Sequence, residues 1–146
     1  MSYQNILVAV DDSPISYAAV EHALSLAKLS GAKVTVLSVV AVDPSVGVDF
    51  YQVAPAITDH FMQAEAHAKL QLQDIAQSFI RDGIEVKTKI QHGAASEGII
   101  FIADEIGADL IIMGSHGRTG VKRLLLGSVA RAVLTESHIP VLIVKQ

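Results

Sequence analysis

The sequence contains no cysteine. A disulfide framework and a thiolate metal site are therefore both excluded, and the chain is compatible with a reducing cytosol. It also lacks a long apolar run near its start, because the first such run covers only residues 6–10 and no basic stretch precedes it. That run is too short for a signal peptide or a membrane span. We therefore expect a cytoplasmic protein that is not inserted in a membrane.

Charge is also scarce. Charged residues make up 18% of the chain, well below the level of a disordered protein, and the net charge of −4 argues against a general nucleic-acid binder. Acidic residues are absent from 110–135, and the basic residues there are Arg118, Lys122, Arg123 and Arg131. A local cationic stretch in an acidic protein favours a small anionic ligand over a long polyanion.

The apolar pattern predicts alternating strands and helices. Strands are expected at 6–10, 33–40, 85–91, 110–113 and 141–144, and helices at 14–30, 58–82, 99–106 and 129–137. Ser13 is expected to cap the first helix, and Gly31 and Gly107 are expected to end the first and third. No low-complexity linker and no repeat interrupts the 146 residues, so residues 1–146 are expected to form one domain. The alternation predicts an α/β fold, a single-domain doubly wound five-stranded parallel sheet with helices on both faces.

The pattern breaks at 41–57, where Pro44, Gly47 and Pro55 interrupt it. This connection is long for a compact domain. A binding loop or lid and a plain surface excursion are equally compatible with it.

Glycines dominate the segment after the fourth expected strand. Gly114 and Gly117 would let backbone amides approach an anion, and Gly127 and Ser128 stand where the last helix begins. The ends of parallel strands are where ligands bind in such sheets. No GxxxxGK[ST] motif occurs, so a phosphate pocket here would not be a Walker A site. The alternative is that these glycines only form tight turns.

Residues 114–128 resemble the Gly-x2-Gly-x9-Gly-Ser/Thr signature of ATP-binding universal stress proteins, and every fixed position matches. The resemblance extends to 6–13, 107–114 and 140–144, which are similar to the family's first, fourth and fifth strands. It implies strand order 3-2-1-4-5, ATP as the ligand and a homodimer.

The resemblance also implies roles for single residues. Those at the adenine and ribose end are Ala9, Asp11 and Val39. Those near the ribose and phosphates are Met113, Gly114 and Gly117, and those that hold the phosphates are Gly127, Ser128 and Val129. His116 and Arg118 lie inside the signature and are candidates for phosphate contacts, whereas Ala130 lacks the hydroxyl that some members carry there.

Metal ligation is less well supported. Mg²⁺ or Mn²⁺ is expected to be carried by the phosphates of ATP, and Asp11 and Asp12 are oxygen ligands that could contact it. His60 and His67 flank Glu65 on the second expected helix, but the seven-residue spacing separates the rings by ~10 Å, which favours a solvated helix face.

Enzymatic activity has little support, because phosphoryl transfer needs a positioned base or water and the sequence identifies none. We expect a nucleotide-responsive regulatory module with at most slow ATP hydrolysis.

Three other classes of protein can be compared with the sequence. A phosphorelay receiver domain would share the acidic pair Asp11-Asp12, but it needs an aspartate at the end of its third strand, and the third expected strand ends in Gln91-His92. A ligand-free module for an unknown protein partner would leave the glycine signature unexplained. A dinucleotide-dependent oxidoreductase would require GxGxxG after the first strand, which is absent.

The last expected strand predicts self-association. In the order 3-2-1-4-5 it lies at the sheet edge, and it is apolar throughout: Val141, Leu142, Ile143 and Val144. Soluble monomers usually protect such an edge with charge, proline or a bulge. We expect an antiparallel contact with the same strand of a second copy, about a two-fold axis.

Overall fold

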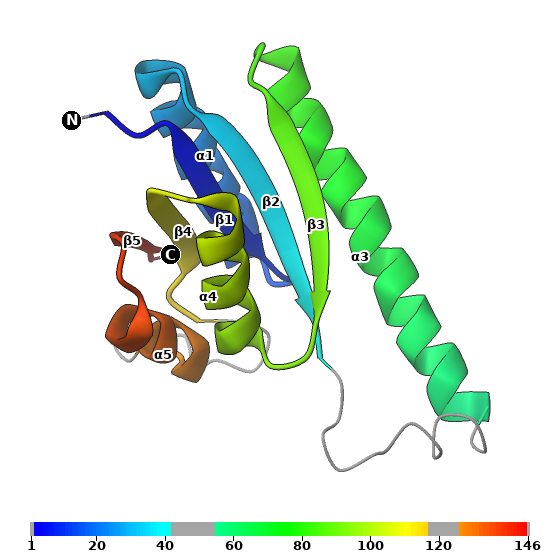
Figure 1. Ribbon diagram of the computed structural model, residues 1–146. Helices are drawn as coiled ribbons and strands as arrows, with labels where there is room; N and C mark the ends of the chain where they lie inside the picture. Colours follow the sequence, from blue (N-terminus) through cyan, green and yellow to red (C-terminus); the bar gives the residue numbers. More distant parts are fainter. Residues whose placement is uncertain (1, 42–54, 117–125, 146) are drawn as a thin grey trace.

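The computed structural model describes residues 2–41, 55–116 and 126–145. Figure 1 shows the elements in these residues, five strands and four helices that alternate along the chain. In chain order they are β1 (Asn5–Val10), α1 (Ile15–Ser30), β2 (Lys33–Val40), α3 (Pro55–Arg81), β3 (Val86–His92), α4 (Ala95–Ile106), β4 (Leu110–Gly114), α5 (Ser128–Glu136) and β5 (Val141–Val144).

All five strands are parallel and lie in one sheet in the order β3-β2-β1-β4-β5. The predicted fold class and strand order are confirmed. The chain moves outward from β1 to β3 on one side and then returns to place β4 on the other side of β1. The order therefore reverses between β1 and β4, which is the point where ligands bind in sheets of this type.

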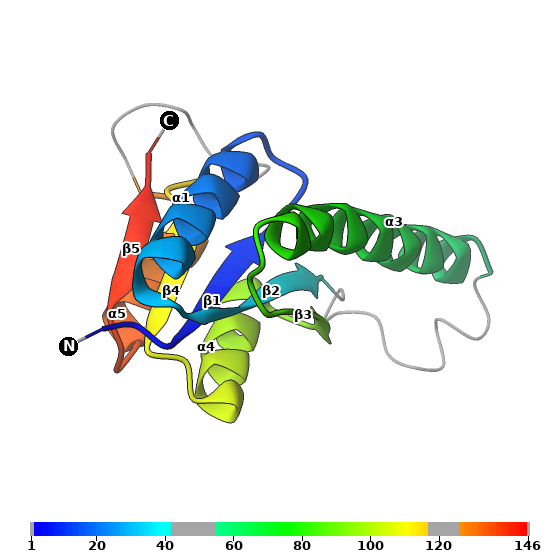
Figure 2. The same ribbon diagram turned by 90° about the horizontal axis from the view of Figure 1, so that it is seen from above.

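Helices cover both faces of the sheet, with α1 and α3 on one face and α4 and α5 on the other (Figure 2). Each face has its own buried cluster, and Phe79 of α3 is fully buried in the first. Leu37, Ile111 and Val133 are fully buried in the second. Double coverage explains why β1 and β4 are nearly continuous apolar runs, since a strand that is buried on both faces has no solvent side.

Helix ends follow the predicted signals in part. Gly31 and Gly107 end α1 and α4 with φ angles of 74° and 66°, the left-handed conformation that glycine adopts without strain. The predicted cap of α1 is wrong. The helix begins at Ile15, Pro14 precedes it, and no side chain caps its amides. Ser13 donates its hydroxyl to Asp11 instead.

Helix α3 is longer than predicted and begins at Pro55, three residues before the expected start. Proline is compatible with a first helical turn because its missing N–H would have no partner there. Figure 1 shows α3 running along β3 and past the carboxyl end of that strand. The expected loop or lid at 41–57 falls mostly outside the described residues. No described helix has the length and hydropathy to cross a bilayer.

Candidate functional site

The turn after β1 is organised around the carboxylate of Asp11. Its Oδ1 accepts hydrogen bonds from the Ser13 amide at 2.9 Å, from the Ser16 hydroxyl at 2.9 Å and from the Ser13 hydroxyl. The Asp11 amide in turn donates to Ser16 Oγ at 2.8 Å. No hydrogen bond from the described residues reaches Oδ2. One carboxylate oxygen thus holds the turn, and the other is available to a ligand.

Helix α3 also contacts this turn through a hydrogen bond to its main chain. Gln71 donates its side-chain amide to the Asp11 carbonyl oxygen at 2.6 Å, across 60 residues of sequence. Gln71 is half-buried in α3. The main-chain position of Asp11 is therefore fixed by α3 as well as by the turn itself.

The end of β4 lies against the start of α1. A Cβ built on Gly114 would stand 2.7 Å from Cγ2 of Ile15, the first residue of α1. Glycine is required here by close packing, which is a structural role in addition to the expected approach to phosphate. Beyond it, the buried Ser115 places its hydroxyl 3.2 Å from Nδ1 of the half-buried His116.

The start of α5 is tied to the same strand end. The Gly127 amide donates to the Ser115 carbonyl oxygen at 2.7 Å, and a Cβ at Gly127 would be 3.2 Å from both that oxygen and His116 Cα. Gly127 precedes the exposed Ser128, and no side chain caps the helix. The first amides of α5 have no helical acceptor, and the positive end of the helix dipole lies beside them.

These elements meet at the switch point of the sheet. β1 and β4 are paired neighbours, with Val8 opposite Ile112, so Asp11 and Gly114 both stand at the carboxyl ends of adjacent strands. Gly127 and Ser128 follow across the backbone bond to Ser115. The ends of these neighbouring strands therefore carry a carboxylate whose Oδ2 has no hydrogen bond from a described residue and a helix start whose first amides have no helical acceptor. That combination suits a ligand with both hydroxyl and phosphate groups.

The expected apolar contacts lie on the α4 and α5 face. Ala9, Val39 and Val129 are half-buried and pack against the second core cluster. Met113 is only 5% exposed and belongs to the same cluster. A ligand could reach Met113 only through the little surface it retains, whereas Ala9 and Val39 offer more. Gly117 and Arg118 lie outside the described residues.

Metal-ligating side chains do not gather in the described part of the chain, which has no group of three or more His, Asp or Glu side chains placed to hold an ion. Glu65, flanked by His60 and His67, is instead 2.9 Å from Nε2 of His92, at the end of β3. Phe61 lies beside the same imidazole, with ring centroids 5.4 Å apart. His60 and His67 thus lie on α3 without forming a metal site with described residues, and Glu65 connects α3 to His92 of β3.

Sequence reasoning missed Gln71 and the pairing of Glu65 with His92. Both contacts join α3 to the carboxyl end of the sheet from distant positions in the chain. No local motif marks either residue, because a helical glutamine or glutamate is ordinary wherever it occurs. Only the path of α3 over the sheet reveals them.

Comparison with known proteins supports a single family. A profile described as the universal stress protein family matches residues 2–145. The universal stress protein MJ0531 of Methanocaldococcus jannaschii is 34% identical over 144 residues, which cover 99% of this chain and 83% of that protein. The solved structure of MJ0577, a hypothetical protein from the same organism, has a TM-score of 0.87 and 32% identity, and the match covers 100% of this chain and 98% of the other.

Nucleotides occur in solved relatives. A universal stress protein in complex with cAMP matches with a TM-score of 0.73 and 26% identity over 99% of this chain and 98% of the other. The Archaeoglobus fulgidus protein in complex with dAMP shares the fold, with a TM-score of 0.65 and 24% identity over 99% of this chain and 100% of the other. Sequence and fold agree over essentially the whole length. The chain therefore belongs to the universal stress protein family.

Proposed function

We propose that this protein is an ATP-binding regulatory module of the cytoplasm, whose nucleotide binds between the Asp11 turn and the start of α5. The observation that carries the proposal is the meeting of two features at the switch point. The Oδ2 oxygen of Asp11 has no partner among the described residues. The start of α5 is tied to the end of β4, the strand next to β1, through the bond from Gly127 to Ser115.

Each part of ATP has a matching group. The ribose hydroxyls are donors that suit the open oxygen of Asp11. The phosphates suit the free amides of Ser128 and Val129, where the helix dipole favours negative charge. The half-buried Ala9 and Val39 offer an apolar wall for adenine. The cAMP found in a relative has the same adenosine moiety, which supports an adenine nucleotide.

The metal is proposed to arrive with the nucleotide. With no protein cluster of metal ligands in the described residues, Mg²⁺ or Mn²⁺ would be held mainly by the phosphates. We propose binding with at most slow hydrolysis, because phosphoryl transfer needs a positioned base or water and the sequence identifies none.

ATP should bind more tightly than NAD or FMN. The site offers phosphate-binding amides and a ribose acceptor, but no dinucleotide fingerprint follows β1. Isothermal titration calorimetry with ATP and Mg²⁺, and separately with NAD, FMN and cAMP, measures the ranking. Saturation with FMN and no heat with ATP would refute the proposal. A preference for cAMP would keep the site but change its ligand.

Replacement of Gln71 by leucine should weaken ATP binding roughly fivefold, because one hydrogen bond that fixes the Asp11 main chain contributes about 1 kcal/mol. Leucine has a similar size, so packing of α3 changes little. Gln73→Leu is the matched control, since Gln73 is exposed on the same helix and has no hydrogen bond to a described side chain. Calorimetry of both variants decides the role. Equal affinities would show that the turn holds Asp11 without help from α3.

A further inference from the structure

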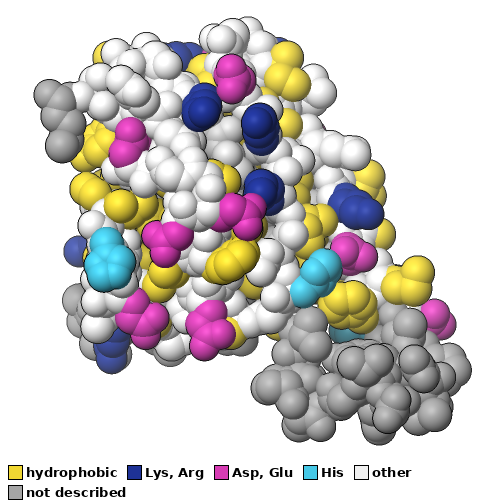
Figure 3. All heavy atoms as spheres, in the orientation of Figure 1, with side chains coloured by type: hydrophobic (Ala, Val, Ile, Leu, Met, Phe, Trp, Pro, Cys, Tyr) yellow, Lys and Arg dark blue, Asp and Glu magenta, His cyan; other side chains and the backbone are white. Residues whose placement is uncertain are grey.

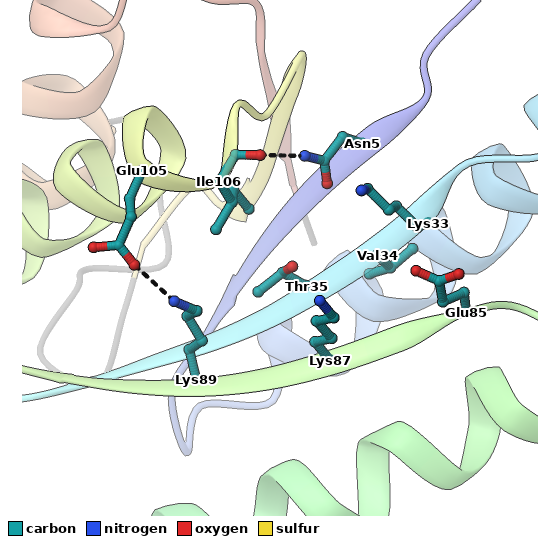
Figure 4. A pocket seen from close by; sticks show the side chains of 9 residues that line it. All are labelled: Asn5, Lys33, Val34, Thr35, Glu85, Lys87, Lys89, Glu105 and Ile106. Carbon is teal, nitrogen blue, oxygen red and sulfur yellow. Dashed lines mark hydrogen bonds and ion pairs between the residues drawn. The ribbon is translucent and has the colours of Figure 1, made fainter.

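A cavity lies at the opposite end of the sheet from the Asp11 turn. It has a volume of about 230 Å³ and opens where β1 and β2 begin (Figure 4). The residues that line it come from β1, β2, β3, the turn before β3 and the end of α4: Asn5, Lys33, Val34, Thr35, Glu85, Lys87, Lys89, Glu105 and Ile106. Nucleotides in this type of sheet bind at the carboxyl ends of strands, so this cavity is separate from the proposed ATP site.

The strand register explains why lysines gather here. Lys87 is opposite Thr35 and Lys89 is opposite Leu37. Because side chains alternate between faces, Lys87 and Lys89 share the α4 face with Leu37, which is fully buried in the second core cluster. Lys87 is exposed, since β3 is an edge strand and α4 does not cover it. Figure 3 shows the resulting group of basic side chains over the first halves of β2 and β3.

The floor of the cavity carries a hydroxyl that opens into it. Thr35 is 5% exposed, and its hydroxyl makes no hydrogen bond to a described residue but is not fully buried. Beside it, Asn5 donates its side-chain amide to the Ile106 carbonyl oxygen at 2.6 Å, which leaves the carboxamide oxygen as an acceptor at the rim. The Thr35 hydroxyl is therefore accessible from the cavity, where it can donate a hydrogen bond to a bound ligand.

The three lysines around Thr35 differ in whether they form an ion pair. Lys89 is neutralised by Glu105, with Nζ 2.7 Å from Oε1. Lys33 and Lys87 form no ion pair with a described residue. Figure 4 shows the ammonium groups of Lys33 and Lys87 extending over the same side of the sheet as Thr35, with Glu85 and Glu105 at opposite ends of the cavity. The centre of the cavity thus presents two unpaired cations and one hydroxyl donor.

We propose that this cavity binds a phosphate group, either as the free ion or on a small metabolite. Lys33 and Lys87 supply positive charge and Thr35 donates a hydrogen bond to a phosphate oxygen. Lysine is a common phosphate ligand that acts as a compact point charge. The volume is below the usual range for drug-sized ligands, so the occupant is small. The carboxamide oxygen of Asn5 can accept a hydrogen bond from a hydroxyl group of a phosphomonoester.

Amide chemical shifts of the ¹⁵N-labelled protein test this site separately from the ATP site. Inorganic phosphate, and in a second series glycerol 3-phosphate, is titrated at constant ionic strength maintained with chloride. We expect saturable shifts at Thr35 and Lys87. Tighter binding of glycerol 3-phosphate would assign the site to a phosphomonoester, and tighter binding of phosphate would assign it to the free ion. The ATP site is monitored in the same spectra at Gly114 and Ser128.

Variants connect the shifts to the proposed donors. Lys87→Gln should weaken phosphate binding roughly tenfold and Thr35→Val several-fold, because each removes one donor to a charged acceptor. Lys69→Gln, which removes an exposed lysine of α3, should have no effect. Shifts confined to Gly114 and Ser128, or shifts that never saturate, would overturn the proposal. The lysines of β3 would then only protect a sheet edge, as charged residues commonly do.

Discussion

Valine in place of Gly127 should weaken ATP binding by at least about 100-fold, the equivalent of two hydrogen bonds to charged phosphate oxygens. A Cβ at this position would already be 3.2 Å from the Ser115 carbonyl oxygen and from His116 Cα. Both contacts are with backbone, which cannot rotate away as a flexible side chain can. Valine adds two methyl groups beyond that Cβ. The 2.7 Å bond from Gly127 to Ser115 must then lengthen, and the first amides of α5 move away from the phosphates.

A graded series separates this effect from simple crowding. Gly127→Ala adds only the Cβ, which a shift of a few tenths of an ångström could accommodate, so we expect roughly a tenfold loss. Gly117→Val, chosen from the sequence signature alone, should also abolish binding. Calorimetric titration with ATP and Mg²⁺ gives the affinities.

Stability is the alternative explanation that must be controlled. Gly31→Ala is a suitable control because Gly31 has a φ of 74° at the end of α1, far from the strand ends that form the site. Alanine there should destabilise the fold by about 1 kcal/mol and leave ATP affinity unchanged. Thermal unfolding followed by circular dichroism measures the stability of each variant. Normal ATP affinity in both Gly127→Val and Gly117→Val would place the nucleotide elsewhere.

The fold was predictable because its signals are local and repeated. Runs such as Ile6–Val10 and Val141–Val144 are apolar on both faces, which is the mark of a covered parallel strand. Glycines at 31 and 107 mark helix ends for a conformational reason that needs no tertiary context. The start of α3 was less predictable, since proline is compatible with both a loop and a first helical turn.

The site was predictable only as a set of positions. Spacing identified Gly127 and Gly114, but it could not show that Gly114 is also required by Ile15, or that Gly127 packs on the backbone of Ser115 and His116. Asp11 was expected to contact ligand. The sequence could not show that its Oδ1 accepts hydrogen bonds from Ser13 and Ser16, which leaves Oδ2 for a ligand. Contacts between segments that are distant in the sequence have no local sequence motif, so they could be identified only from the structure.

Self-association depends on the free edge of β5. The amide of Ile111 donates to the Pro140 carbonyl oxygen and the amide of Ser115 donates to the Val144 carbonyl oxygen. Because main-chain groups alternate in direction along a strand, residues 140, 142 and 144 face β4, and Val141 and Ile143 point their N–H and C=O groups away from the sheet. The side chains of Val141, Leu142 and Ile143 are only half-buried. An apolar strand with an open row of donors and acceptors is a template for pairing.

We propose that two copies pair antiparallel through β5, and Val141→Pro should convert the resulting dimer to a monomer. Proline removes the outward N–H of Val141 without removing a bond to β4, so the fold of each subunit is preserved. Thr88→Pro is the matched control, because Thr88 is exposed on β3 at the opposite edge of the sheet. The Glu85 carbonyl oxygen accepts from Val34 of β2, so alternation points the N–H of Thr88 outward as well. Multi-angle light scattering at micromolar concentration should show a dimer for the parent and Thr88→Pro, and a monomer for Val141→Pro. A monomeric parent at high concentration, or a dimer that persists in Val141→Pro, would contradict pairing through β5.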